Sequence, residues 1–425
     1  MKILLDHNKY YRFPWTLTDN AISWLEVTKA CNIYCEGCYR QNDPAGHKSL
    51  EDIKRDLETL KRSRKADVLS IAGGEPLLHP NLAEIVRLAA HEGWKPNIIT
   101  NGVILNSELV RELKTAGVAG FTFHVDSKQR RPEWNGKTEI ELNKLRHQYA
   151  EMLASVGGLS CIFNCTVYEE TLKYVPDIVA WGQRYIDIVH TLVFIAFRAI
   201  LIKERFHYFA GSERIDMGQI VYSTPDNSKR VDILCTHIVE AIGTRHPEFE
   251  PSAYLNGTEK ADSFKWLVSE RIGTRERIYG YVGPKFMELI QTIHHFFKGK
   301  YLAQVRPSLL GHGKAILLMA LLDKGVRAAA KSFLFSDWEN PFHLFRKLYV
   351  QSITIIQPMD VLYNGSCNMC DGCPDITVWN NKLVSSCRLE EQMKFGCFVR
   401  AVPKRNWDSP EGAGEHENYD HQRVA

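Results

Sequence analysis

Strand-like and helix-like stretches alternate along residues 23–197, and this alternation limits the fold more than any other feature of the chain. Six short apolar stretches are separated by helical stretches such as 49–64 and 107–117, in which apolar side chains recur every three or four positions. Strands joined through helices in this way lie parallel, with right-handed crossovers. We therefore predict an α/β fold whose six strands form an open sheet or a full or partial barrel.

Polar and glycine residues follow directly after the first four predicted strands. In chain order they are the loop that begins at Cys31, the segment Gly73–Glu75, Asn101, and the pair Asp126–Ser127. Functional residues of parallel α/β folds lie at the carboxyl ends of the strands. We expect these four segments to face one cavity.

The loop after the first strand carries three cysteines, Cys31, Cys35 and Cys38, with the spacing CX3CX2C. A structural zinc site takes four ligands with paired spacing, and no fourth ligand is adjacent here. Three thiolates can instead hold three irons of a [4Fe–4S] cubane and leave the fourth iron without a protein ligand. The spacing therefore favours an iron–sulfur cluster with one open iron.

With this loop followed by six βα units, the sequence resembles the radical S-adenosylmethionine (radical SAM) enzymes from about residue 21 to about residue 200. The resemblance implies a partial (β/α)6 TIM-type barrel, with a helical insertion and a small C-terminal cysteine-rich cluster domain. It implies that the three cysteines bind a [4Fe–4S] cluster whose open iron binds SAM. Reductive cleavage of SAM would then give methionine and a 5′-deoxyadenosyl radical, which abstracts hydrogen from the substrate.

The same resemblance implies that residues at the strand ends bind SAM: Gly73, Gly74, Glu75, Asn101, Asp126 and Ser127. The first three match the family's GGE segment, which meets the amino group of SAM. The last three fall at strand ends that line the ribose and carboxylate of SAM in relatives. No catalytic residue is expected beyond the cluster ligands.

One position departs from the family pattern. The residue before the third cysteine is usually aromatic and lies near the adenine of SAM, but here it is Gly37. Tyr39, just after the motif, is the candidate substitute.

A second set of cysteines lies near the end of the chain. Cys367, Cys370 and Cys373 have the spacing CX2CX2C, which resembles the bacterial ferredoxin run, and Cys387 completes four thiolates for a second [4Fe–4S] cluster. Cys397 is the alternative fourth ligand, and a four-cysteine zinc site is the alternative metal centre. A fully ligated cluster has no open iron, so we expect it to transfer electrons or to oxidise the substrate radical.

The chain divides into five predicted segments: an N-terminal extension (1–20), the core barrel (21–205), a mainly helical insertion (206–350), an auxiliary cluster module (351–403) and a flexible tail (404–425).

The insertion is helical and apolar in pattern from Pro284 onward, with ten Lys or Arg against four Asp or Glu between Lys285 and Val350. We expect it to cap the open barrel mouth with a solvated basic face. The alternative is that the insertion forms a lid that admits a long apolar substrate, or that docks on an anionic membrane surface. The order of segments also resembles, on fewer features, radical SAM proteins related to tetraether-lipid synthases.

Composition narrows the location and the partners. The formal net charge of +3 does not point to nucleic acid. The apolar run Ala315–Leu322 is too short to span a bilayer, and the first residues lack a signal-peptide pattern. We expect a cytoplasmic protein, or one peripheral to the membrane, whose thiols are reduced.

The leading hypothesis is a radical SAM enzyme, an oxidoreductase or transferase, whose substrate is unidentified, with an apolar, lipid-like molecule as one candidate. A peptide-modifying maturase is the alternative, and the resemblance implies a reductant protein such as flavodoxin or ferredoxin. Two other classes are a non-catalytic iron–sulfur electron carrier and a zinc-stabilised binding module. The GGE segment and the three-cysteine loop favour the enzyme, because a carrier needs neither an open iron nor a segment that binds an amine.

Overall fold

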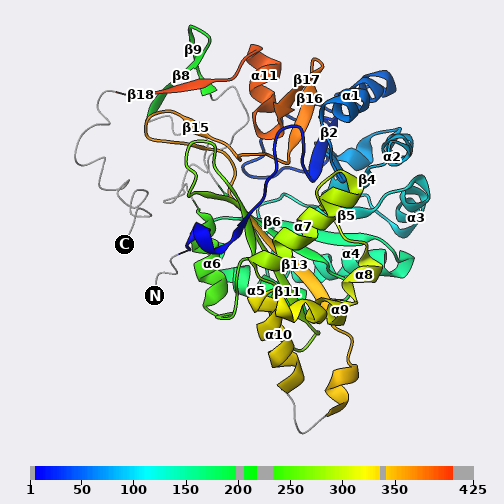
Figure 1. Cartoon of the computed structure of the whole chain (residues 1–425). Coiled ribbons are helices and arrows are strands. Elements are labelled where there is room, and N and C mark those ends of the chain that lie inside the picture. Colours follow the sequence, from blue (N-terminus) through cyan, green and yellow to red (C-terminus); the bar gives the residue numbers. More distant parts are fainter. Residues whose placement is uncertain (1–4, 198–204, 218–232, 336–340, 405–425) are drawn as a thin grey trace.

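A computed structural model describes residues 5–197, 205–217, 233–335 and 341–404, and its main sheet contains the six parallel strands expected from the sequence (Figure 1). These strands are β2 (Ile22–Thr28), β3 (Val68–Gly73), β4 (Lys95–Thr100), β5 (Gly120–His124), β6 (Ser160–Val167) and β7 (Thr191–Ala196). The helices between them are α1 (Leu50–Ser63), α2 (Leu82–His91), α3 (Ser107–Ala116), α4 (Asn143–Val156) and α5 (Val175–Arg184). The prediction of a partial (β/α)6 barrel is confirmed.

The helices cover the sheet through apolar stripes. In α1, which begins after the N-cap Ser49, the side chains of Ile53, Leu57 and Leu60 are buried. Strand β3 is almost continuously apolar because both of its faces are covered. The largest hydrophobic core therefore lies between the sheet and these helices.

Four further strands extend the sheet beyond β7. In sheet order they are β13 (Tyr349–Ile356), β11 (Phe264–Gly273), β10 (Ala253–Asn256) and β1 (Tyr11–Arg12), while β12 (Ile278–Tyr281) pairs with β11. Strand β13 is parallel to β7, and β11 is antiparallel to β13. The sheet path begins at β1 and ends at β2, which are not paired with each other, so the barrel is open between them.

The structure differs here from the predicted mainly helical insertion at 206–350. Besides α6 (Cys235–Gly243) and the helices after Pro284, the described part of this range contains β10, β11, β12 and the pair β8 (Phe206–Ala210) and β9 (Glu213–Ile215). In β11, buried and partly exposed residues alternate with a strand period, but the buried positions include Lys265, Ser269 and Arg271, so the sequence shows no apolar alternation there. Strand β13 also crosses the predicted boundary at 350, because it belongs to the main sheet.

The helices of the insertion are α7 (Pro284–Lys298), α8 (Pro307–Leu310), α9 (Gly313–Leu317), the 3-10 turn η5 (Leu318–Leu321), α10 (Lys324–Phe335) and the 3-10 turn η6 (Pro341–Phe345). They lie at the amino ends of the parallel strands. His295 Nε2 is 2.8 Å from Asp19 Oδ2 just before β2, and Lys95 at the start of β4 donates to Gln304 O at 2.8 Å. The expectation that this segment caps the mouth above the cysteine loop is therefore wrong, because that loop follows the carboxyl end of β2.

The C-terminal segment fills the open side of the barrel. It contains the hairpins β14 (Asp360–Val361) with β15 (Cys367–Asn368) and β16 (Ile376–Trp379) with β17 (Lys382–Ser385), then the turn η7 (Ser386–Arg388), α11 (Leu389–Phe395) and β18 (Arg400–Pro403), which pairs with β8. Asn20 before β2 donates to Gly372 O at 2.9 Å, and Asp371 N donates to Asn256 O of β10 at 2.9 Å. The turn between the late cysteines therefore bridges the two ends of the sheet. Of the predicted tail, 405–425 lies outside the described residues.

Candidate functional site

The cysteine loop connects β2 to α1 and is fixed from both sides. Cys31 N donates to Asn42 Oδ1 at 2.9 Å, and Asn42 Nδ2 donates back to Cys31 O at 3.0 Å. The middle of the loop runs beside the segment after β5, where Glu36 N donates to Lys128 O at 3.1 Å. This double attachment holds Cys31, Cys35 and Cys38 at the carboxyl edge of the sheet.

The three thiols lie close enough to act on one another. Burial raises the pKa of each thiol, and Cys31 and Cys38 each contribute to raising the pKa of Cys35. All three remain partly exposed. Within the described ranges, no three Cys, His, Asp or Glu side chains converge on a point as metal ligands do. The donor set nevertheless fits a cluster held by three thiolates, because three thiols share one short loop with no fourth cysteine on it.

Glycine at 73 and 74 allows the turn after β3 to lie directly on the start of the cysteine loop. An added Cβ would lie 2.2 Å from Thr28 O at Gly73 and 2.3 Å from Ala30 O at Gly74. Glu75 N donates to Ala30 O at 2.7 Å. The two glycines therefore have a packing role in this structure, and their contact with SAM stays a prediction.

Replacing Gly74 with alanine should therefore loosen the cysteine loop. The obstructing atoms are backbone atoms, so we expect a loss of about 1–3 kcal/mol in the free energy of unfolding, as for other overpacked sites, together with weaker iron retention. Gly136→Ala is the control, because no atom lies within 4 Å of the added Cβ there, so any loss comes only from its φ of +76°, a backbone strain that Gly74 does not have. Thermal unfolding and iron analysis measure both effects; equal iron retention in the two variants would contradict this role.

Glu75 is fully buried and ties the ends of β3 and β4 together. Its carboxylate accepts hydrogen bonds from Thr100 Oγ1 and Asn101 N, both at 2.6 Å, and from Leu77 N at 3.0 Å. Burial raises its pKa despite these bonds. The sequence correctly placed this carboxylate at the edge, and the structure adds its hydrogen bonds to β4.

Asn101 lies beside the cysteine loop, as expected. Its Nδ2 donates to Asn32 Oδ1 at 2.7 Å and lies 4.0 Å from Cys31 Sγ. Its Oδ1 accepts from Val103 N at 2.9 Å. The side chain therefore connects the end of β4 to the first cysteine.

Asp126 and Ser127 lie at the end of β5, close to Cys35. Asp126 Oδ2 is 3.0 Å from His124 Nε2, and its Oδ1 accepts from Lys128 N at 2.9 Å. Burial alone would raise the pKa of Asp126, but the contacts with His124 and Lys128 hold it below its usual value. Asp126 is therefore a buried carboxylate on the same edge as Cys35, whose thiol pKa it helps to raise.

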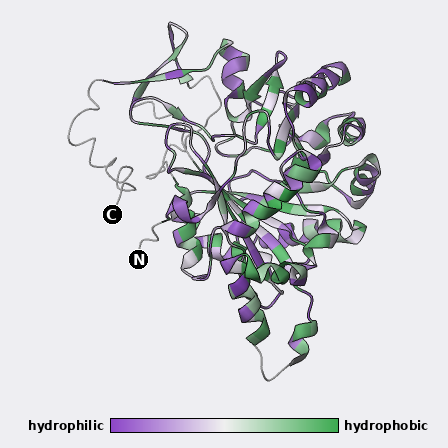
Figure 2. Ribbon diagram, in the orientation of Figure 1, coloured by the Kyte–Doolittle hydropathy of each residue, from purple (hydrophilic) through white to green (hydrophobic). Residues whose placement is uncertain are grey.

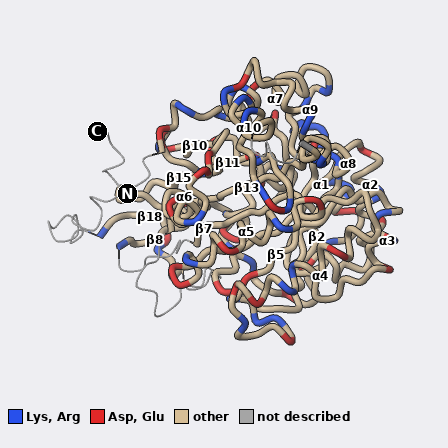
Figure 3. The backbone as a smooth tube through the Cα atoms, turned by 90° about the horizontal axis from the view of Figure 1, so that it is seen from below, with Lys and Arg blue, Asp and Glu red and all other residues tan. Residues whose placement is uncertain are grey.

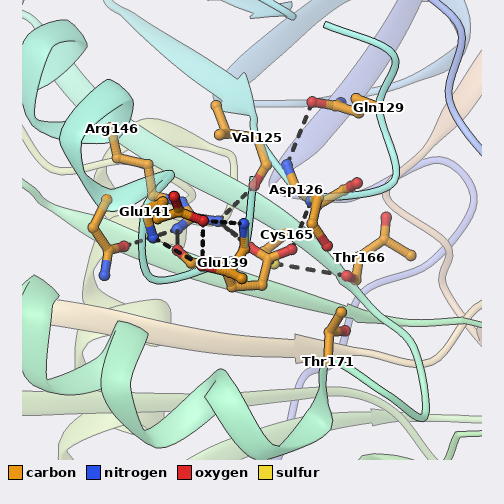
Figure 4. A network of polar contacts seen from close by, with 12 residues as sticks. Val125, Asp126, Gln129, Glu139, Glu141, Arg146, Cys165, Thr166 and Thr171 are labelled. Atoms are coloured by element: carbon orange, nitrogen blue, oxygen red, sulfur yellow. Dashed lines mark hydrogen bonds and ion pairs between the residues drawn. The ribbon is translucent and has the colours of Figure 1, made fainter. Parts of the chain in front are cut away.

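A buried polar network that the sequence analysis missed supports this strand end (Figure 4). Glu139 accepts from Ser127 N at 2.6 Å and pairs with Arg146 at 2.5 Å, and both side chains are at most 1% exposed. Arg146 also donates to Val125 O at 2.8 Å, and Cys165 Sγ lies 3.5 Å from Glu139 Oε2. The network fixes the backbone of residues 125–127, and no local sequence pattern predicts it.

The aromatic side chain next to Gly37 comes from the end of β7. An added Cβ at Gly37, whose φ is +75°, would lie 2.6 Å from Phe197 Cε2. The rings of Phe197 and Tyr168 stack with their centroids 4.8 Å apart, and Tyr168 Oη donates to Glu36 O at 2.8 Å. Tyr39 instead packs against the small cluster around β8 and β18. Phe197, rather than Tyr39, therefore supplies an aromatic ring beside the loop.

The late cysteines are brought together in part. The Cys370 thiol hydrogen bonds to Cys373 and raises the pKa of the Cys373 thiol. Burial, and after it the nearby Cys373, raises the pKa of the Cys387 thiol. Cys367 lies near Arg388, which also lies near Cys387. Cys397 follows α11 and is partly exposed. The choice of Cys387 as fourth ligand stays a prediction, which its place beside Cys373 supports.

A buried bridge links the two sets of cysteines. Arg40, two residues after Cys38, pairs with Glu26 on β2 and donates to Ser386 O and Ser386 Oγ, both at 2.9 Å. Ser386, which immediately precedes Cys387 in the chain, also donates from its Oγ to Glu26 Oε1 at 3.0 Å. The side chains of Arg40 and Glu26 are only 6% and 7% exposed. One ion pair therefore connects the loop of the first set to the turn of the second.

Residues 25–181 match the model of the Radical SAM superfamily, so this part of the chain is a radical SAM domain. Such proteins use a [4Fe–4S] cluster and SAM. A relative from Selenomonas ruminantium, an S-adenosylmethionine-dependent nucleotide dehydratase, is 39% identical over 87 residues, which cover 20% of this chain and 32% of the relative. An AdoMet-dependent heme synthase from Methanosarcina barkeri is 32% identical over 108 residues, 25% of this chain and 30% of the relative.

The chain thus spans about a third of the length of these curated relatives. Among solved structures, Streptococcus suis SuiB bound to S-adenosylmethionine is a loose likeness, with a TM-score of 0.34 and 13% identity over 50% of this chain and 43% of SuiB. In the described part of the chain, no helix is both long and apolar enough to span a membrane.

Proposed function

We propose that this protein is a radical SAM enzyme whose cluster is held by Cys31, Cys35 and Cys38. When bound there, a reduced [4Fe–4S] cluster supplies the electron that splits SAM into methionine and a 5′-deoxyadenosyl radical, which takes a hydrogen atom from the substrate. The observation that supports the proposal best is the meeting of the three thiols with the Gly73–Gly74 turn and Asn101 at one sheet edge. An external one-electron donor, such as flavodoxin or ferredoxin, is the proposed partner.

The protein residues have two roles in this proposal. Glu75, Asn101, Asp126 and Ser127 would receive the polar groups of SAM, and the buried hydrogen bonds of the strand ends keep them in place before SAM binds. Phe197 packs on the loop at Gly37 and supports it with an apolar side chain. The direct test is the formation of 5′-deoxyadenosine when the reduced, iron-loaded protein is given SAM; no product above a protein-free control would reject the proposal.

The substrate would approach from the carboxyl edge. Because the helical insertion lies at the amino edge, it cannot line an apolar path to the carbon that carries the radical. Its position therefore does not favour a lipid-like substrate. The strand ends beside the cysteine loop are what a substrate would meet. An electron carrier is less favoured, because it has no use for the buried carboxylates and amide gathered beside an incomplete thiol set.

The late cysteines are proposed to hold a second [4Fe–4S] cluster. Loaded wild-type protein should then contain about eight irons, and a variant with Cys31, Cys35 and Cys38 changed to alanine should keep about four. Iron and zinc analysis of anaerobically purified protein measures this. About four irons with one zinc in the wild type would identify the late cysteines as a zinc site instead.

A further inference from the structure

The far end of the helical insertion exposes large apolar side chains. We call residues 314–335 and 341–347 the apolar tip. Eight of the eighteen strongly exposed large hydrophobic residues in the described chain lie in it: Leu318, Leu321, Leu322, Leu334, Phe335, Phe342, Leu344 and Phe345. Exposure reaches 82% for Leu318, 86% for Leu321 and 82% for Phe345. Such a concentration is unusual for a surface that faces only water.

The tip is held in place by packing on its other side. Val326, Ala329 and Phe333 of α10 are buried. Ala329 packs closely on β12, because a Cβ added at Gly280 would lie 2.9 Å from Ala329 Cβ. His343 Nε2 lies 2.8 Å from Phe333 O, which joins η6 to α10. The apolar residues are therefore presented by a folded support. Figure 1 shows α10 projecting from the lower end of the molecule, and Figure 2 colours its lower end and the short helix that follows it as hydrophobic.

Among the described residues of the tip, the exposed charges are all positive. The tip contains six basic residues, all exposed: Lys314, Lys324, Arg327, Lys331, Arg346 and Lys347. Its one acidic residue among those described, Asp323, is 1% exposed and accepts from Gly283 N at 2.8 Å and Phe286 N at 3.0 Å. Figure 3 looks at this end and shows Lys and Arg around α9 and α10.

We propose that the apolar tip docks on an anionic lipid bilayer, with its leucines and phenylalanines in the interface and its lysines and arginines on the headgroups. Exposed Leu and Phe flanked by Lys and Arg are the pattern of interfacial membrane anchors. A second copy of this chain fits the tip poorly, because a two-fold interface would place like charges opposite each other. A nucleic acid would use the cations but leave the apolar side chains without a partner.

Docking through the tip would turn the cysteine loop away from the bilayer, because the insertion packs on the amino edge of the sheet and the loop follows the carboxyl edge of β2. The proposal goes beyond SAM chemistry and does not depend on it. Variants of the tip should therefore lose membrane binding without losing cleavage of SAM.

The experiment is co-sedimentation of the full-length protein with vesicles of phosphatidylcholine alone or with added phosphatidylglycerol. We expect binding only to the anionic vesicles, weakened by salt. The triple variant Leu318→Ser, Leu321→Ser and Phe345→Ser, and the double variant Lys324→Glu and Lys331→Glu, should each bind at least about tenfold more weakly. Because all five side chains are exposed, the variants should unfold at temperatures near that of the wild type.

Matched controls lie elsewhere on the surface. Leu17→Ser with Ile140→Ser, and Lys54→Glu with Lys144→Glu, change exposed residues on other elements and should bind like the wild type. Three results would overturn the proposal: wild-type binding that does not need anionic lipid, tip variants that bind as tightly as the controls, or a dimer that the tip variants abolish without any vesicle binding. The last would assign the tip to a second copy.

Discussion

Replacing Cys31, Cys35 and Cys38 together with alanine is expected to reduce the formation of 5′-deoxyadenosine from SAM to the level of a protein-free control. Thiolate ligation holds the iron, so without the three sulfurs there is no cluster to deliver an electron. The measurement is the yield of 5′-deoxyadenosine and methionine from reduced, reconstituted protein under anaerobic conditions.

The matched control for this triple variant is Cys161→Ala. Cys161 is buried on β6, and burial raises the pKa of its thiol, so it has the character of a core residue rather than of a ligand. The control should lose a modest amount of stability and keep SAM cleavage. If the triple-alanine protein cleaved SAM as fast as this control, the assignment of the cluster to the loop would be wrong.

The parallel half of the fold could be read from the sequence because its signals are local. Each strand from β2 to β7 is a short apolar run closed by a turn or helix signal, and handedness then fixes the crossovers. The same logic placed Glu75, Asn101 and Asp126 on one edge. Their positions follow from strand ends alone and need no knowledge of distant contacts.

The features that could not be read are pairings between distant segments. Phe197 reaches Gly37 only once β7 lies opposite the cysteine loop, and Glu139 finds Ser127 only through a loop with no regular period. The predicted position of the insertion was wrong for a related reason. An amphipathic helix shows which of its faces is apolar, but not which edge of the sheet that face will cover.

A second large effect is expected at the bridge between the two sets of cysteines. Arg40→Met should lower the free energy of unfolding by about 3–5 kcal/mol, because it leaves the Glu26 carboxylate buried without its cation. Arg40 holds the pKa of Glu26 below its usual value against the opposing effect of burial. Without Arg40, that pKa should rise, so the loss should be full at neutral pH and should shrink as Glu26 becomes protonated at lower pH.

Three companion measurements separate this bridge from a generic defect. Arg87→Met removes an exposed ion pair with Glu84, whose side chains are 57% and 43% exposed, and should change the stability by less than about 1 kcal/mol. Adding Glu26→Gln to Arg40→Met should recover part of the loss, because the unpaired charge is then absent. Since Arg40 also anchors Ser386 next to Cys387, Arg40→Met should lower iron content at the late cysteines more than Arg87→Met does. An Arg40→Met protein as stable and as iron-rich as Arg87→Met would show that the bridge does not support the second site.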